Sequence, residues 1–144
     1  MAPGYAVTLP PVPGKANPAV NQNNIKQTIC VAGWTKTVRP PASYTNKLKL
    51  QQMKALGLPG PPSLYEEDHL QSIEDGGDPV DPSNLWPQPY AGKWGARTKD
   101  RIETLLKRLV CNGTITLDEA GRELRTDWVA AWLARIGNES EAGK

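Results

Sequence analysis

Histidine and cysteine are scarce in this chain of 144 residues, which holds one histidine, His69, and two cysteines, Cys30 and Cys111. A structural zinc ion takes four ligands, usually cysteine or histidine, and these three residues cannot supply them. No run approaches the roughly 18 apolar residues of a membrane-spanning helix, so we expect no membrane partner. Gly92 and Gly95 follow no strong strand and form no dinucleotide-binding motif. Zinc-ribbon, membrane-spanning and dinucleotide-binding classes are therefore excluded.

The redox state of the two cysteines would indicate the cellular compartment of the protein. Cys30 and Cys111 lie far apart, and neither belongs to a Cys-x-x-Cys pair. Each follows a short helical pattern beside apolar residues, so we favour a disulfide over two separate buried thiols. The disulfide would add about 4 kcal/mol of stability in the chain-entropy model. It would indicate a periplasmic or secreted protein, whereas free thiols would indicate a cytoplasmic or phage-associated one.

The length suits one compact domain, which we expect over residues 19–137. Residues 1–18 are rich in proline and predict an extended arm, and residues 138–144 predict a polar tail. Seventeen Lys and Arg against 15 Asp and Glu give a net charge of +2, which does not oppose a polyanionic partner. Acidic residues gather within 66–81 and basic residues within 93–108. This pattern suits a cation site beside a phosphate track, or an ordinary solvated surface.

The first half of the domain predicts mostly short elements. Residues 21–29 predict a short helix and residues 31–38 an extended segment. That segment stops at Pro40 and Pro41, because neither proline can donate a backbone hydrogen bond. A one-sided apolar stripe predicts a helix over residues 43–56.

The pattern then changes to a hairpin followed by helices. Residues 67–73 and 84–87 predict two brief strands around the turn at Gly76-Gly77. A helix with an apolar stripe follows and stops at Asn112-Gly113. The stripe consists of Ile102, Leu105, Leu106, Leu109 and Val110. Thr116 and Glu119 have the spacing of a capping box, which predicts that the last helix begins there and runs to about Ile136.

His69 carries any imidazole chemistry that this chain performs near neutral pH. Phosphodiester hydrolysis needs a base that deprotonates water and a divalent cation that neutralises the transition state. Asp68 directly precedes His69. Neighbouring strand residues point to opposite faces, so the two serve one site only if the strand ends or twists there. The alternative is a hairpin histidine that is hydrogen-bonded to a carboxylate.

Four segments together carry a resemblance to a known family. They are Glu66-Glu67-Asp68-His69-Leu70, Glu74-Asp75-Gly76-Gly77, Asp81-Pro82-Ser83-Asn84-Leu85-Trp86-Pro87-Gln88-Pro89 and Lys99-Asp100-Arg101-Ile102-Glu103. With the upstream segments 28–31, 33–35 and 38–41, they resemble a bacterial and phage branch of the HNH (ββα-metal) endonucleases over residues 17–132. Asp-His followed by Asn-Leu-Trp-Pro is more specific than Asp-His alone.

The resemblance implies an α+β fold, a small and mostly helical domain around a ββα-metal core of strand, turn, strand and helix. It implies that His69 is the general base, that Asp68 ligates the cation, and that Asn84, on the second strand, fixes the loop and the imidazole. The cation would be Mg²⁺, with Mn²⁺ and Zn²⁺ as alternatives. The family's last ligand, an Asn or His, is missing from residues 93–98. Asp100 would replace it; the alternatives are water in that position or an impaired enzyme.

Basic residues near the start of the predicted helix are the expected phosphate ligands. Lys99 and Arg97 would steady the scissile phosphate, while Lys93 and Arg101 would bind the backbone of DNA, or of RNA, with weak sequence preference. The predicted function is a metal-dependent endonuclease. The alternative is a non-catalytic nucleic-acid-binding or interaction protein on an HNH scaffold with an incomplete metal site.

Two further groups have a plain structural interpretation. Asp100 and Glu103 would then lie on a solvated helix face, with an ion pair between Glu103 and Lys107. The tryptophans are interpreted as core residues, although two of them could stack on bases. Trp34, Trp128 and Trp132 are assigned to the core, and Trp86 and Trp94 are the two with the stacking alternative.

Overall fold

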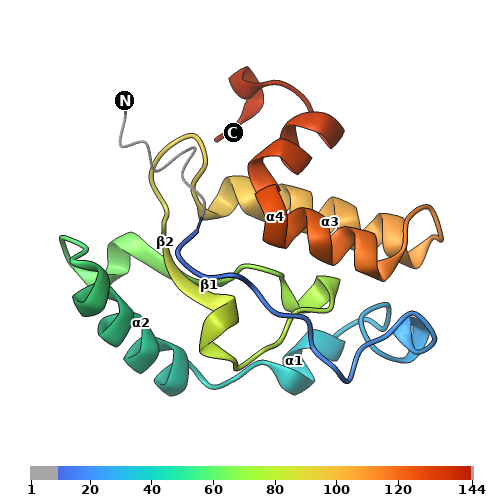
Figure 1. Ribbon diagram of the computed structural model, residues 1–144, viewed down its shortest axis with the longest axis horizontal. Coiled ribbons are helices and arrows are strands. Elements are labelled where there is room, and N and C mark those ends of the chain that lie inside the picture. Colours follow the sequence, from blue (N-terminus) through green and yellow to red (C-terminus); the bar gives the residue numbers. More distant parts are fainter. Residues whose placement is uncertain (1–9, 144) are drawn as a thin grey trace.

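The computed structural model describes residues 10–143, so most of the predicted arm, residues 1–9, and Lys144 lie outside the described residues (Figure 1). A two-stranded hairpin lies between the helix α2 and the helix pair α3 and α4 (Figure 1). The bounds are α1 Trp34–Val38, α2 Ala42–Leu56, β1 Tyr65–His69, β2 Leu85–Pro89, α3 Ala96–Cys111 and α4 Leu117–Arg135. The predicted α+β class is confirmed.

The hairpin pairs β1 with β2 in antiparallel register, from Tyr65 opposite Pro89 to His69 opposite Leu85. The first strand is shorter than predicted, because the chain turns away after His69 into a single helical turn at Ile73–Asp75. The turn that follows requires glycine at position 77, since a Cβ atom there would lie 1.7 Å from the carbonyl oxygen of Gln71. β1 therefore ends at the histidine, which leaves His69 at the junction of strand and loop.

The described part of the predicted arm packs along this loop instead of extending outside the core. The backbone N–H of Gly14 donates to the carbonyl of Ser83 at 2.9 Å, and that of Asp78 donates to the carbonyl of Lys15 at 2.9 Å. Farther along, the N–H of Asn17 donates to the carbonyl of Gly76 at 2.8 Å. Residues 14–17 are therefore part of the folded unit, because their polar backbone groups pair with those of the loop.

The helix pair forms the larger part of the core. Its buried side chains include Ile102, Leu106 and Val110 from α3 and Leu124, Trp128 and Trp132 from α4. The predicted capping box is confirmed, because the Thr116 hydroxyl accepts the N–H of Glu119 at 3.1 Å and the Glu119 side chain bonds back. α4 kinks at Asp127, whose side chain accepts the N–H of Ala130 at 3.0 Å and so caps the second half of the helix.

Two predictions about the segment around Cys30 have opposite outcomes. The disulfide between Cys30 and Cys111 is confirmed, and it joins the chain before α1 to the last residue of α3. The extended segment over residues 31–38 is wrong, because the chain forms helix α1 there. Gly33 turns the chain with a φ of 82°, and Trp34 then packs half-buried against the core. The contact of Trp34 with the core thus favours the helix over an extended segment.

Four of the five tryptophans are buried, namely Trp86, Trp94, Trp128 and Trp132, and the core assignment holds for them. Trp94 meets Trp132 edge to face at a centroid distance of 5.4 Å. No helix within residues 10–143 is long and apolar enough to cross a membrane.

Candidate functional site

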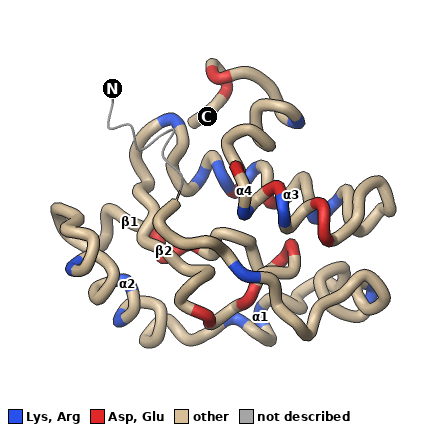
Figure 2. The backbone as a smooth tube through the Cα atoms, viewed as in Figure 1, with Lys and Arg blue, Asp and Glu red and all other residues tan. Residues whose placement is uncertain are grey.

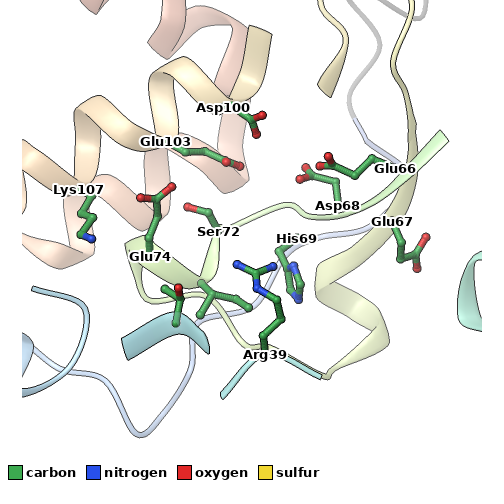
Figure 3. Close-up of a pocket in the computed structure, with 12 residues that line it drawn as sticks. Arg39, Glu66, Glu67, Asp68, His69, Ser72, Glu74, Asp100, Glu103 and Lys107 are labelled. Carbon is green, nitrogen blue, oxygen red and sulfur yellow. The ribbon is translucent and has the colours of Figure 1, made fainter. Parts of the chain in front are cut away.

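A cavity of about 420 Å³ lies between the end of β1, the loop after it, α3 and the segment around α1 (Figure 3). Its lining is strongly acidic. The lining residues are Thr35, Arg39, Glu66, Glu67, Asp68, His69, Ser72, Ile73, Glu74, Asp100, Glu103 and Lys107. Three predicted site residues, Asp68, His69 and Asp100, therefore border one cavity.

The His69 ring is held by the loop. Its Nε2 lies 2.9 Å from the carbonyl oxygen of Pro79, and the side chain is 7% exposed. A carbonyl can only accept, so Nε2 carries the proton and Nδ1 of the neutral ring keeps its lone pair. Burial lowers the pKa of His69, which favours the neutral form. The ring is thus fixed by a carbonyl, and a proton acceptor remains at Nδ1.

Asn84 holds the loop that carries Pro79. Its Oδ1 accepts the backbone N–H groups of Lys15 and Gln71, both at 3.0 Å. Its Nδ2 donates to the carbonyls of Gln71 at 3.0 Å and of Asp78 at 2.8 Å. Asn84 precedes β2 instead of lying on it, and within residues 10–143 it makes no hydrogen bond to His69. The predicted loop-fixing role matches this geometry, whereas the direct bond to the imidazole does not.

Lys99 lies behind the site and not at its surface. Its side chain is fully buried, and its Nζ lies 2.9 Å from Oδ2 of Asp68 and donates to the backbone carbonyl of His69 at 3.0 Å. It also pairs with the Glu103 carboxylate. Burial alone would lower the pKa of Lys99, but Asp68 and Glu103 raise it above its ordinary value. The predicted contact of Lys99 with a phosphate is wrong in this structure, because no solvent reaches the ammonium.

Glu103, like Lys99, is buried, whereas the structural interpretation of the sequence placed it on a solvated helix face. It is 5% exposed and pairs with Lys99, not with Lys107, so it does not lie on a solvated face. Asp100 is exposed, and it lines the cavity on the side of α3. Its partial burial in the cavity raises the pKa of Asp100, and the negative charge of Asp68 raises it further.

Glu66 is a site residue that the sequence reasoning missed. It lies two positions before Asp68, on the same face of β1, and Figure 3 shows the two carboxylates pointing the same way, opposite Asp100. Burial first, and then the neighbouring Asp68, raise the pKa of Glu66 to about 8. The predicted strand begins at residue 67, whereas β1 begins at Tyr65, so a strand predicted two residues earlier would have shown that Glu66 and Asp68 share a face. With this pKa, the Glu66 carboxyl group carries a proton near neutral pH in the absence of a cation.

The predicted nucleic-acid-binding residues lie outside the cavity, around the start of α3. Lys93 is exposed and pairs with Glu139 at 2.8 Å. Arg97 lies 5.9 Å from the ring centroid of Tyr90, while Arg101 lies over a tryptophan ring. Figure 2 shows basic residues along α2 and α3 and acidic residues beside the hairpin. These three side chains can form a surface for phosphates, but they do not reach the acidic cavity.

Carboxylates are the donors through which the site could hold a cation. Asp68, Glu66 and Asp100 offer hard oxygen ligands, which suit Mg²⁺ or Mn²⁺ better than zinc. A bound cation would lower the raised pKa values of Glu66 and Asp100, because it favours their charged forms. In the part of the chain that the structure describes, no group of three or more such side chains converges as a finished metal site. The oxygen donors therefore fit a hard cation, but the carboxylate side chains would have to move closer together to bind it.

Comparison of the chain with protein-family models, curated proteins and solved structures gives no match.

Proposed function

We propose that the chain is a metal-dependent endonuclease of the HNH type that hydrolyses phosphodiester bonds of DNA, with RNA as a second substrate. The observation that carries the proposal is the state of His69, a neutral imidazole fixed at Nε2 by the Pro79 carbonyl in the wall of an acidic cavity. A base of this kind beside carboxylates is what hydrolysis of a phosphodiester requires.

The proposed reaction needs a base, which is His69, and a cation site, which carboxylates of β1 and α3 would form. His69 takes a proton from water at Nδ1, and the Pro79 carbonyl stabilises the imidazolium through the proton on Nε2. Asp68, Glu66 and Asp100 would hold Mg²⁺ or Mn²⁺, which when bound would neutralise charge on the phosphate.

Two neighbours keep this base in place. Asn84 fixes the loop of Pro79, and Lys99 fixes the backbone carbonyl of His69. Both are buried, so they act by positioning other groups.

The order of elements supports the ββα-metal interpretation. β1, the loop, β2 and α3 follow one another, and α3 contacts the hairpin through Lys99. Exposed Lys93, Arg97 and Arg101 at the start of α3 would bind phosphates without reading bases, so binding should weaken with salt. The disulfide supports a periplasmic or secreted location.

Conversion of supercoiled plasmid to the open circle tests this proposal. Purified protein with millimolar Mg²⁺ or Mn²⁺ should nick the plasmid, and excess EDTA should stop the reaction. Absence of nicking with either cation, on both DNA and RNA substrates, would remove the proposal.

A non-catalytic role on the same scaffold is the second candidate, and one observation favours it. The Asp68 carboxylate already has the Lys99 ammonium as a cationic partner at 2.9 Å, so the chain itself supplies a positive charge at that ligand. Calorimetry with Mn²⁺ separates the candidates. The nuclease should bind Mn²⁺ and lose affinity in Asp68→Asn, whereas a scaffold should bind none at millimolar metal.

A further inference from the structure

We propose that Arg39 forms an anion subsite that binds the phosphate of a nucleic-acid phosphodiester next to His69, and that Lys107 adds positive charge from the other side of the same cavity. The inference rests on the proposed function, because it names the part of that site which holds the phosphate. Neither residue was named as a phosphate ligand from the sequence, although Lys107 lies within the basic stretch 93–108, and both line the acidic cavity.

The two cations stand out because they have no fixed partner. Within residues 10–143, neither side chain forms an ion pair or a hydrogen bond, although carboxylates line the same cavity. Lys99, by contrast, is paired with two carboxylates, and Lys93 is paired with Glu139. Arg39 is exposed and Lys107 is half-buried, so a ligand in the cavity can reach both.

Figure 3 shows the Arg39 guanidinium alongside the His69 ring, whereas Lys107 lies on the far side of the cavity beside Glu74. Glu66, Asp68 and Asp100 gather at another end. Burial lowers the pKa of His69, and the positive charge of Arg39 also lowers it. Burial raises the pKa of Glu74, and the positive charge of Lys107 opposes that rise.

A bound phosphodiester needs both kinds of surroundings. A cavity lined only by carboxylates would repel the negative oxygens of the phosphate. A planar guanidinium can bind two of these phosphate oxygens at once. Arg39 is the stronger ligand in this arrangement, and Lys107 contributes a point charge.

The disulfide joins the two parts of the chain that carry these residues. The backbone N–H of Arg39 donates to the carbonyl of Thr35 at 3.0 Å at the end of α1, and Pro40 then restricts the Arg39 backbone. Lys107 lies about one helical turn before Cys111 on α3. Because Cys111 is bonded to Cys30, the segment leading to α1 and the end of α3 are held together. The two cations are thus carried by elements that one covalent bond links.

Binding of thymidine 3′,5′-bisphosphate, measured by calorimetry on the full chain in EDTA, tests the subsite without a metal. Arg39→Gln should weaken binding about tenfold, and Lys107→Gln by a smaller factor, since charged hydrogen bonds to phosphate are lost. Arg39→Lys should bind with intermediate affinity, because it keeps the charge without the two-pronged contact. Lys36→Gln on α1 and Arg108→Gln on α3 are matched controls, because both residues are exposed, are near Arg39 and Lys107 in the chain and lie outside the cavity; they should bind like wild type.

Unchanged binding in both Arg39→Gln and Lys107→Gln, or no binding by wild type, would overturn the subsite. Thermal unfolding of each variant confirms that a loss of binding is not a loss of fold. Plasmid nicking separates this inference from the proposed function. Wild-type nicking that both substitutions leave unchanged removes the subsite alone, whereas Arg39-dependent binding without nicking supports the subsite and removes the nuclease.

Discussion

The Lys99 ammonium lies 2.9 Å from the Asp68 carboxylate, with side chains that are 0% and 7% exposed. Lys99 comes from α3 and Asp68 from β1, so this pair joins the helix to the hairpin. The same ammonium binds the backbone carbonyl of His69. The packing of helix on hairpin and the position of the proposed base therefore depend on one buried cation.

Lys99→Met should destabilise the fold by about 3 to 5 kcal/mol, because Asp68 and Glu103 would stay buried without a cation. Urea unfolding measures the change. The control is Lys93→Met, which removes the exposed pair with Glu139 and should cost far less, because solvent screens that pair. Equal stability of the two variants would show that the buried ammonium is not needed.

Asn84→Ala should lower the free energy of unfolding by roughly 2 to 4 kcal/mol, because it leaves backbone groups of Lys15, Gln71 and Asp78 without partners. The same substitution at Asn138, whose side chain serves an exposed turn, should cost far less. A small and similar effect in both variants would count against the loop-fixing role. Chemical denaturation provides both values.

Replacing both cysteines by serine should lower stability by about 4 kcal/mol in the chain-entropy model. The wild-type protein unfolded with a reducing agent present should show the same loss, since only the Cys30–Cys111 bond differs. Thermal unfolding with and without the reductant makes the comparison. A melting temperature that is insensitive to reductant would mean that the bond adds little.

The pH dependence of stability should include a contribution from Asp75, which is fully buried and accepts one hydrogen bond from Ser72. Burial raises the pKa of Asp75 well above its ordinary value of 3.8. Its stabilising contribution is therefore complete below that ordinary value and is lost as the pH rises through the raised pKa.

Asp75→Asn should reduce this loss, so the stability of the variant relative to wild type should increase with pH. Urea unfolding over a pH series measures the difference, with exposed Asp118→Asn as the control. Parallel profiles for wild type and Asp75→Asn would contradict the assignment.

Elements with local signals were predictable from the sequence. The stripe from Ile102 to Val110 and the capping pair Thr116 and Glu119 lie within single helices, so their patterns suffice. α1 was predicted as extended, because nothing local shows that Trp34 packs against distant helices.

Some residues of the candidate site were likewise predictable from the sequence, and others were not. Asp68 and His69 were predicted as site residues because they are adjacent in the chain, and the structure places both in the lining of one cavity. The burial of Lys99 and the presence of Arg39 depend on contacts between elements far apart in the sequence. A charged residue on a helix is usually solvated, so only the packed fold reveals that Lys99 is not.

Plasmid nicking by His69→Ala tests the central claim most directly, because His69 is the only histidine of the chain. Wild type should convert supercoiled to open-circular DNA with Mg²⁺ or Mn²⁺. The variant, folded and at equal concentration, should be slower by at least about 100-fold, the usual contribution of a general base. Nicking by His69→Ala at the wild-type rate would contradict the account.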